Sequence, residues 1–143
     1  TRLDYFRDIS TYGGCTAPMT AALESTRIIE DENLVENSRV MGEYLLERLS
    51  ELKKYDCVGE VRGQGLFCGI EYVNNKETRE PVTEEQMAQL MGNVLGQNVI
   101  VGRTNASFHG LNNVMNFAPC LIITKEQVDT IVAAVATAIE KTF

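Results

Sequence analysis

The 143-residue sequence has few side chains that could bind a metal ion or form a disulfide framework. It contains one histidine, His109, and its cysteines are widely spaced with no CxxC pair: Cys15, Cys57, Cys68 and Cys120. Structural zinc sites use close pairs of cysteine and histidine ligands, so we expect no metal site. We interpret the cysteines as small buried hydrophobic residues of a cytoplasmic protein, because the cytosol keeps thiols reduced.

Basic charge and long apolar runs are also scarce. The 13 Lys and Arg residues are scattered and are outnumbered by 20 Asp and Glu, which gives a net charge of −7. This balance argues against nucleic acid or an anionic membrane as a partner. No apolar run approaches the roughly 20 residues of a membrane span, and no signal peptide opens the chain. The sequence begins at Thr1 rather than at Met, and we expect it to be a fragment.

A loop with two glycines, Ser10–Thr16 (STYGGCT), precedes an alanine-rich segment that predicts a helix over residues 17–31. Glycines let backbone N–H groups approach a ligand closely. The first turn of a helix adds unpaired N–H donors and the positive end of the helix dipole, a combination that favours an anion such as phosphate. The alternative is an ordinary helix N-terminus, with Thr16 as the N-cap and Pro18 in the first turn.

Three further helices are predicted by an N-cap residue that is followed three positions later by Glu or Gln. These pairs are Asn33 with Glu36, Thr83 with Gln86, and Thr124 with Gln127. The first helix should run over residues 33–54, the second should stop at Gly96, and the third should lie near the C-terminus. Their apolar stripes are Leu34, Met41, Leu45, Leu49 and Leu52; then Met87, Leu90, Met91, Val94 and Leu95; then Val128, Ile131, Val132, Val135, Ala138 and Ile139.

Strands are predicted between these helices. Residues 58–73 read as two extended pieces joined at Gly63 and Gly65, and the second piece alternates so that one face should be buried. That face comprises Leu66, Cys68, Ile70 and Tyr72. Short strands are expected over residues 99–101 and 114–118. The order of elements predicts an α+β domain with a small, mostly antiparallel sheet covered by helices on one face.

Three short motifs occur in order along the chain: Thr11–Gly14 (TYGG), Val61–Leu66 (VRGQGL) and Ala118–Thr124 (APCLIIT). Together with the two helices after the first motif, they resemble the final third of class III pyridoxal-phosphate aminotransferases, especially the group that uses ω-amino acids and pyruvate. The resemblance implies the C-terminal small domain of the fold type I architecture over residues 33–143. Residues 1–32 would be the cofactor-phosphate loop and connecting helix at the large-domain boundary.

The resemblance also implies a cofactor site shared between subunits. In this family the matching loop reaches the cofactor phosphate of the other subunit of a homodimer. The resemblance therefore assigns cofactor contacts to Ser10, Thr11 and Tyr12, with the Thr11 hydroxyl as a hydrogen-bond donor to the cofactor phosphate. The chain departs from the family at Cys15-Thr16, where His-Pro is common. The Schiff-base lysine and the aspartate that pairs with the cofactor ring lie upstream of the matched region, so no catalytic residue is expected here.

One arginine, Arg103, follows the expected strand Val99–Val101 and Gly102. A loop arginine can point its planar fork at a carboxylate or sulfonate, which is how related enzymes hold the acidic end of the amino donor or of pyruvate. The alternative is an ordinary solvated arginine. Arg62 resembles a recurrent family arginine beside glycines, and we interpret it as structural.

The predicted function is that of the parent enzyme, which would transfer an amino group from taurine, β-alanine or a similar ω-amino acid to pyruvate. The fragment alone should be inactive, because it lacks a lysine suited to a Schiff base. Another class of function is a free-standing α+β binding or interaction module. The apolar residues spread around helix 17–31 argue against such a module, since they suit burial on several sides. A racemase or decarboxylase of the same fold is a further alternative.

Overall fold

The computed structural model describes Thr11, residues 13–104 and residues 112–143. Ser10 and Tyr12, which the sequence assigns to the cofactor site, and His109 lie outside the described residues. The chain divides into two compact units, Thr1–Leu34 and Val35–Phe143. None of the helices in the described part of the chain has the length and apolarity needed to span a membrane.

The first unit contains one long helix, α1 (Thr16–Asp31). Its N-cap is Cys15, with extended φ and ψ of −79° and 113°, so the prediction of Thr16 as the cap is wrong by one residue. Thr16 already belongs to the helix, and Pro18 lies in the first turn, where its missing N–H removes no hydrogen bond. Among the described residues of α1 none is buried, and the apolar side chains of Met19, Leu23 and Ile28 are exposed.

The junction after α1 differs from the sequence prediction at Asn33. This residue has a φ of 52°, which is the left-handed region and not the extended conformation of an N-cap. Asparagine tolerates this region because its short polar side chain can bond locally. The carboxylate of Glu36 accepts hydrogen bonds of 2.9 and 2.6 Å from Arg39, so it does not form the predicted capping box.

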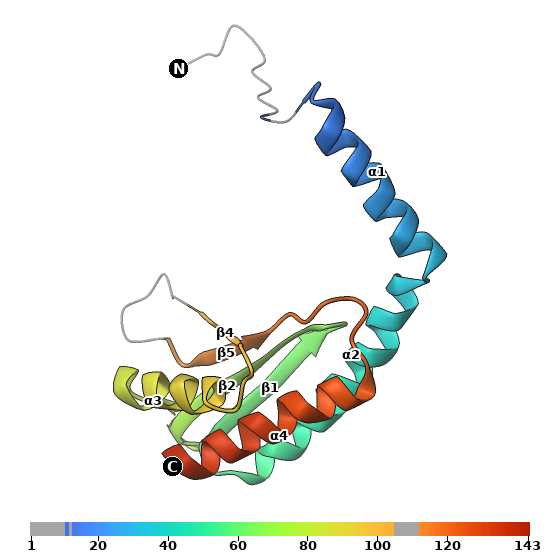
Figure 1. The fold of residues 1–143 in the computed structure, drawn as a ribbon. Coiled ribbons are helices and arrows are strands. Elements are labelled where there is room, and N and C mark those ends of the chain that lie inside the picture. The colour runs from blue at the N-terminus through green and yellow to red at the C-terminus, as the bar shows by residue number, and fades with distance from the viewer. Residues whose placement is uncertain (1–10, 12, 105–111) are drawn as a thin grey trace, which may run out of the picture. The chain divides into compact units, whose positions relative to one another are not determined.

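The second unit is an antiparallel sheet with helices against it (Figure 1). Its elements are α2 (Leu34–Ser50), the short 3₁₀ helix η1 (Glu51–Lys54), β1 (Val58–Gln64), β2 (Phe67–Asn75), β3 (Glu80–Pro81), α3 (Glu84–Leu95), β4 (Gly102–Arg103), β5 (Val114–Phe117) and α4 (Lys125–Thr142). The strand order is β1-β2-β5-β4, and β3 pairs with β2. Every pairing among the described strands is antiparallel, which confirms the predicted α+β class.

One face of the sheet forms the hydrophobic core. The predicted buried face of β2 is confirmed, since Cys68, Ile70 and Tyr72 are at most 3% exposed. Met115 and Phe117 of β5 join them, and the apolar stripes of α2, α3 and α4 pack against this layer. The opposite face carries exposed side chains, among them Phe67 and Arg62. Arg62 donates from Nη1 to Glu60 and to Glu71, each over 2.9 Å.

Three side chains predicted to be buried are exposed. Leu95 is 60% exposed because it is the last residue of α3, where the helix ends and its stripe no longer faces the core. Cys15 and Cys120 are also exposed, since one caps α1 and the other lies in the segment between β5 and α4. Cys57 and Cys68 are buried as expected, and burial raises the pKa of the Cys57 thiol to about 11.

The starts of α3 and α4 confirm two of the predicted capping boxes. Thr83 and Thr124 each accept a hydrogen bond from the backbone of the Gln three residues later, and that Gln side chain accepts one from the N-cap backbone. Each box satisfies two N–H groups that the helix leaves unpaired. The sequence therefore determines where these two helices begin, and α3 ends before Gly96 as predicted.

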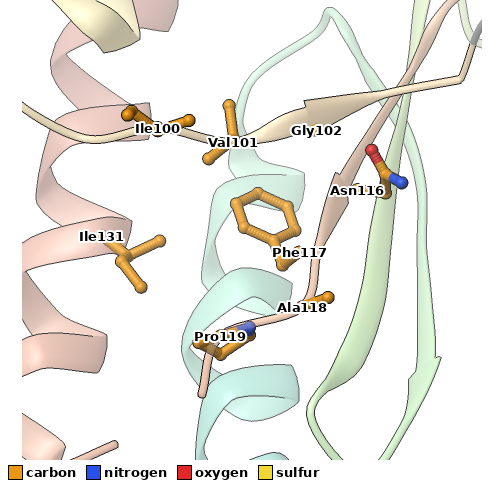
Figure 2. A pocket seen from close by; sticks show the side chains of 8 residues that line it. All are labelled: Ile100, Val101, Gly102, Asn116, Phe117, Ala118, Pro119 and Ile131. Atoms are coloured by element: carbon orange, nitrogen blue, oxygen red, sulfur yellow. The ribbon is translucent and has the colours of Figure 1, made fainter.

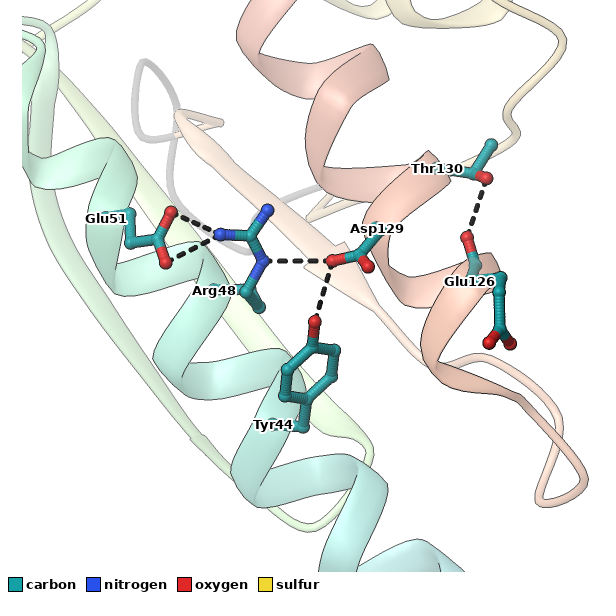
Figure 3. Close-up of polar contacts among 6 residues, drawn as sticks. All are labelled: Tyr44, Arg48, Glu51, Glu126, Asp129 and Thr130. Atoms are coloured by element: carbon teal, nitrogen blue, oxygen red, sulfur yellow. Dashed lines mark hydrogen bonds and ion pairs between the residues drawn. The ribbon is translucent and has the colours of Figure 1, made fainter.

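A polar cluster joins α2 to α4 (Figure 3). Asp129 accepts hydrogen bonds from the Tyr44 hydroxyl at 2.9 Å and from Nε of Arg48 at 3.0 Å. Arg48 also binds the carboxylate of Glu51 through Nη1. The bond to Asp129 raises the pKa of the Tyr44 hydroxyl, because deprotonation would place two negative charges together. This cluster fixes the two helices side by side along the sheet (Figure 1).

Candidate functional site

The loop before α1 has the properties of an exposed anion-binding turn. Thr11 lies in a turn with its side chain exposed. Gly14 has a φ of 80°, and a Cβ built there would meet nothing within 4 Å. The N-cap residue Cys15 makes no side-chain hydrogen bond to the helix start, so no cap side chain satisfies the first N–H groups of α1. These donors and the Thr11 hydroxyl fit a phosphate group.

The lysines of the chain do not fit the other half of a pyridoxal phosphate site. A lysine that forms a Schiff base must be desolvated to lower its pKa. Every lysine of this chain is solvent-exposed: Lys53, Lys54, Lys76, Lys125 and Lys141. Covalent attachment of the cofactor would therefore need a lysine from elsewhere.

Arg103 lies within a strand, which corrects the prediction that it follows one. The backbone of β4 pairs Gly102 with Asn116 and Arg103 with Met115, and residues 99–101 are not a strand. Continued pairing would bring residues 99–101 opposite residues 117–119. The ladder cannot extend there, because β5 ends at Phe117 and Pro119 has no backbone N–H.

The Arg103 side chain is held by two neighbouring residues. Its Nε donates to the backbone oxygen of Asn112 at 3.0 Å, and its Nη2 forms an ion pair with Oε2 of Glu84. Asn112 in turn donates from Nδ2 to Oε1 of the same carboxylate. The side chain of Arg103 is only 19% exposed. Arg103 is thus an anchored cation rather than the solvated arginine that the alternative reading proposed.

Sequence reasoning missed Glu84 and Asn112 as members of this cluster. Glu84 is the first residue of α3, where a carboxylate is favoured by the helix dipole. It lies 19 residues before Arg103, and Asn112 lies nine residues after it. Neither spacing belongs to a local motif, so only the packing of α3 against the end of the sheet brings the three together.

A small pocket lies beside β4 and β5 (Figure 2), with a volume of about 280 Å³. Its lining residues are Ile100, Val101, Gly102, Asn116, Phe117, Ala118, Pro119 and Ile131. The side-chain oxygen of Asn116 is buried there without a hydrogen-bond partner among the described residues. None of the lining side chains is titratable, so the pocket can hold an apolar group but supplies no acid or base.

The two candidate sites belong to different units, with Thr11 in the first and Arg103 in the second. Within the described residues, no three His, Cys, Asp or Glu side chains gather in a way that could hold a metal ion. The structure thus offers hydrogen-bond donors at a turn and helix start in the first unit and an anchored arginine in the second.

Comparison with known proteins identifies the family. The sequence pattern of the family Aminotransferase class-III matches residues 6–139. The chain is 44% identical over 142 residues to the hypotaurine/taurine–pyruvate aminotransferase of Paracoccus denitrificans, covering 99% of this chain and 31% of that protein. It is 46% identical over 132 residues to the taurine–pyruvate aminotransferase of Bilophila wadsworthia, covering 92% of this chain and 29% of that protein.

A solved structure gives the same result. The crystal structure of a Bacillus anthracis aminotransferase superimposes with a TM-score of 0.90 at 40% identity, covering 96% of this chain and 31% of that one. The chain spans slightly less than a third of the length of these relatives. The matched residues include the TYGG, VRGQGL and APCLIIT motifs, and the chain therefore belongs to the class III aminotransferases.

Proposed function

We propose that this chain is the C-terminal part of a pyridoxal-phosphate-dependent aminotransferase that moves the amino group of taurine, β-alanine or a similar ω-amino acid to pyruvate. The names of the two relatives support taurine as donor and pyruvate as acceptor. The exposed lysines support the view that the chain alone is inactive. The proposal includes a cytoplasmic homodimer with the active site at the subunit interface. The exposed apolar side chains of α1 suit burial in such an assembly.

The loop before α1 would hold the cofactor phosphate. When bound, pyridoxal phosphate supplies an electron sink for the bond that breaks at the amino-bearing carbon. The Thr11 hydroxyl and the N–H groups at the start of α1 would bind the phosphate oxygens and fix the position of the cofactor. Gly14 allows this turn, because a left-handed φ of 80° strains other residues.

Arg103 would hold the acidic group of the substrate, and its anchoring is the observation that carries this part of the proposal. Two contacts fix the guanidinium of Arg103. A planar fork of N–H donors suits the oxygens of a carboxylate and of a sulfonate alike. The same residue could therefore serve taurine, β-alanine and pyruvate in the two halves of a ping-pong reaction.

The test is Arg103→Ala in the aminotransferase that contains this chain. The kcat/KM for taurine and β-alanine should fall at least about 30-fold, because truncating one partner of a desolvated charge pair costs on the order of 2 to 5 kcal/mol. A simple amine without an acidic group should lose far less. The matched control is Arg62→Ala, which removes an arginine from the open face of the sheet and should not discriminate between the donors.

A parallel decline for acidic and neutral donors would show that Arg103 supports the fold and not the substrate. The same assay addresses the alternative reactions of the fold. Formation of alanine from pyruvate indicates transamination, whereas a racemase or decarboxylase would leave pyruvate unchanged. A free-standing binding module is not favoured, because the family match extends over residues 6–139.

A further inference from the structure

The carboxylate of Glu84 links the two ends of the segment that contains Arg103 and Asn112. Its Oε2 pairs with Nη2 of Arg103, and its Oε1 accepts from Nδ2 of Asn112. The backbone oxygen of Asn112 accepts from Nε of Arg103 and closes the ring of contacts. The backbone of Glu84 is itself fixed, because it follows the capping box of Thr83 at the start of α3.

These contacts occupy one specific edge of the guanidinium. An arginine offers two pairs of parallel donors, one made by Nε and Nη2 and the other by Nη1 and Nη2. Glu84 and Asn112 take both donors of the first pair. Among the described residues, the hydrogen bonds of Arg103 involve only Nε and Nη2. An acidic ligand that binds with two bonds would therefore use Nη1 and the second hydrogen of Nη2.

We infer that Glu84 is a positioning residue for substrate recognition, which fixes the Nε edge of Arg103 so that its Nη1 end meets the acidic group. This inference rests on the proposed role of Arg103. A free arginine side chain has many rotamers, and binding would have to order them each time. A guanidinium that is already held loses less freedom when it binds a carboxylate or sulfonate.

The negative charge of Glu84 also opposes an anionic ligand, and the structure indicates that this effect is the smaller one. The Glu84 side chain is 56% exposed, whereas Arg103 is 19% exposed. Water screens the exposed carboxylate from a ligand at the far end of the guanidinium. The contact between Glu84 and Nη2 of Arg103 is direct, so screening by water does not remove its effect on the position of the guanidinium. Removal of Glu84 should therefore weaken the binding of acidic substrates.

The test compares Glu84→Ala, Glu84→Gln and Glu85→Ala in the aminotransferase that contains this chain. Glu84→Ala should raise KM for taurine and β-alanine roughly 10-fold while kcat stays within about 2-fold, and a neutral amine should be unaffected. Glu84→Gln should restore part of the affinity, because its amide oxygen still accepts from Nη2. Glu85 is exposed in the same first turn, so Glu85→Ala controls for the loss of negative charge at the helix start.

A double variant separates positioning from a general effect on the fold. In an Arg103→Ala background, Glu84→Ala should cause no further rise in KM for acidic donors, since the two residues act as one unit. The inference is wrong if the rise persists in that background, if the neutral amine is equally affected, or if KM for acidic donors falls. If Arg103→Ala is selective and Glu84→Ala is not, only the positioning role fails. If Arg103→Ala itself is not selective, the proposed role of Arg103 in substrate binding fails as well.

Discussion

Gly42 provides a sharp test of how closely α2 packs on the turn between β1 and β2. Gly42 is buried inside α2, and a Cβ built there would overlap the backbone of Gly65. Gly65 has a φ of 55°, which restricts how the turn could move away. Because the clash is with backbone atoms, no change of rotamer relieves it. Gly42→Ala should therefore strain the contact between the helix and the turn.

Two opposing effects set the size of this change. Alanine in a helix interior gains about 0.5 to 1 kcal/mol over glycine. Overpacking a closely packed site costs about 1 to 3 kcal/mol, and a clash with backbone belongs to the upper part of that range. We expect Gly42→Ala to lower the free energy of unfolding by about 1 to 2 kcal/mol.

The matched control is Gly92→Ala in α3. Gly92 is exposed, and a Cβ there would meet nothing within 4 Å. Only the helix-propensity term then remains, so the free energy of unfolding should rise by about 0.5 to 1 kcal/mol. For a chain of this size each kcal/mol shifts Tm by about 2 to 4 °C. Thermal and urea unfolding followed by circular dichroism would measure both variants.

The opposite signs of the two changes are the result that matters. If both variants gain stability, Gly42 of α2 does not lie against the backbone of Gly65. If both lose stability to a similar extent, the cost is a general one of replacing glycine and does not report on this contact. Either outcome would refute the reasoning.

The remaining predictions concern the cofactor, the lysines and the thiols. Thr11→Ala in the aminotransferase that contains this chain should weaken cofactor binding roughly 10-fold to 150-fold, since a hydrogen bond to a charged phosphate is worth about 1.5 to 3 kcal/mol. An unchanged rate of cofactor dissociation would show that the loop does not bind the cofactor. The chain alone, mixed with pyridoxal phosphate and reduced with borohydride, should carry no stoichiometric adduct on any one lysine. The reason is that all five lysines are exposed, whereas a Schiff-base lysine must be desolvated. A single full adduct would contradict this prediction. At pH 8 a thiol reagent should react rapidly with the exposed Cys15 and Cys120 and slowly with Cys57 and Cys68, because burial raises the pKa of both buried thiols. Burial raises the Cys57 pKa from 9.0 to about 11 on folding. The contribution of Cys57 to the free energy of unfolding is therefore fully present below pH 9 and is lost as the pH rises through about 11. Rapid reaction of all four thiols in the folded chain would show that the core is open.

Local features of the sequence were sufficient where the interactions are local. The capping boxes at Thr83 and Thr124 each involve residues three positions apart, so the sequence contains both partners. The alternation in β2 likewise predicts which face is buried, because successive side chains point to opposite faces. Prediction failed at Asn33, where the chain needs a left-handed residue to pass from α1 to α2 and not a cap.

The limits of strand β4 could not be read from residues 99–101. Their apolar character favours a strand, yet pairing requires a partner, and β5 ends at Phe117 before Pro119. The sequence singled out Arg103 as a site residue, which stays a prediction, and the position of Arg103 within β4 depends on that pairing. Its contacts with Glu84 and Asn112 depend on three segments that are distant along the chain.

The sequence by itself determined the α+β class, the helix starts at Thr83 and Thr124, the buried face of β2 and the family to which the chain belongs. These follow from spacings of two to four residues and from short motifs, which report the conformation of one segment at a time. Only the tertiary structure decided that Gly42 is closely packed while Gly92 is open, and that Glu84 holds Arg103. The physical reason is that a contact between distant segments depends on how whole elements pack, and no local pattern contains that information.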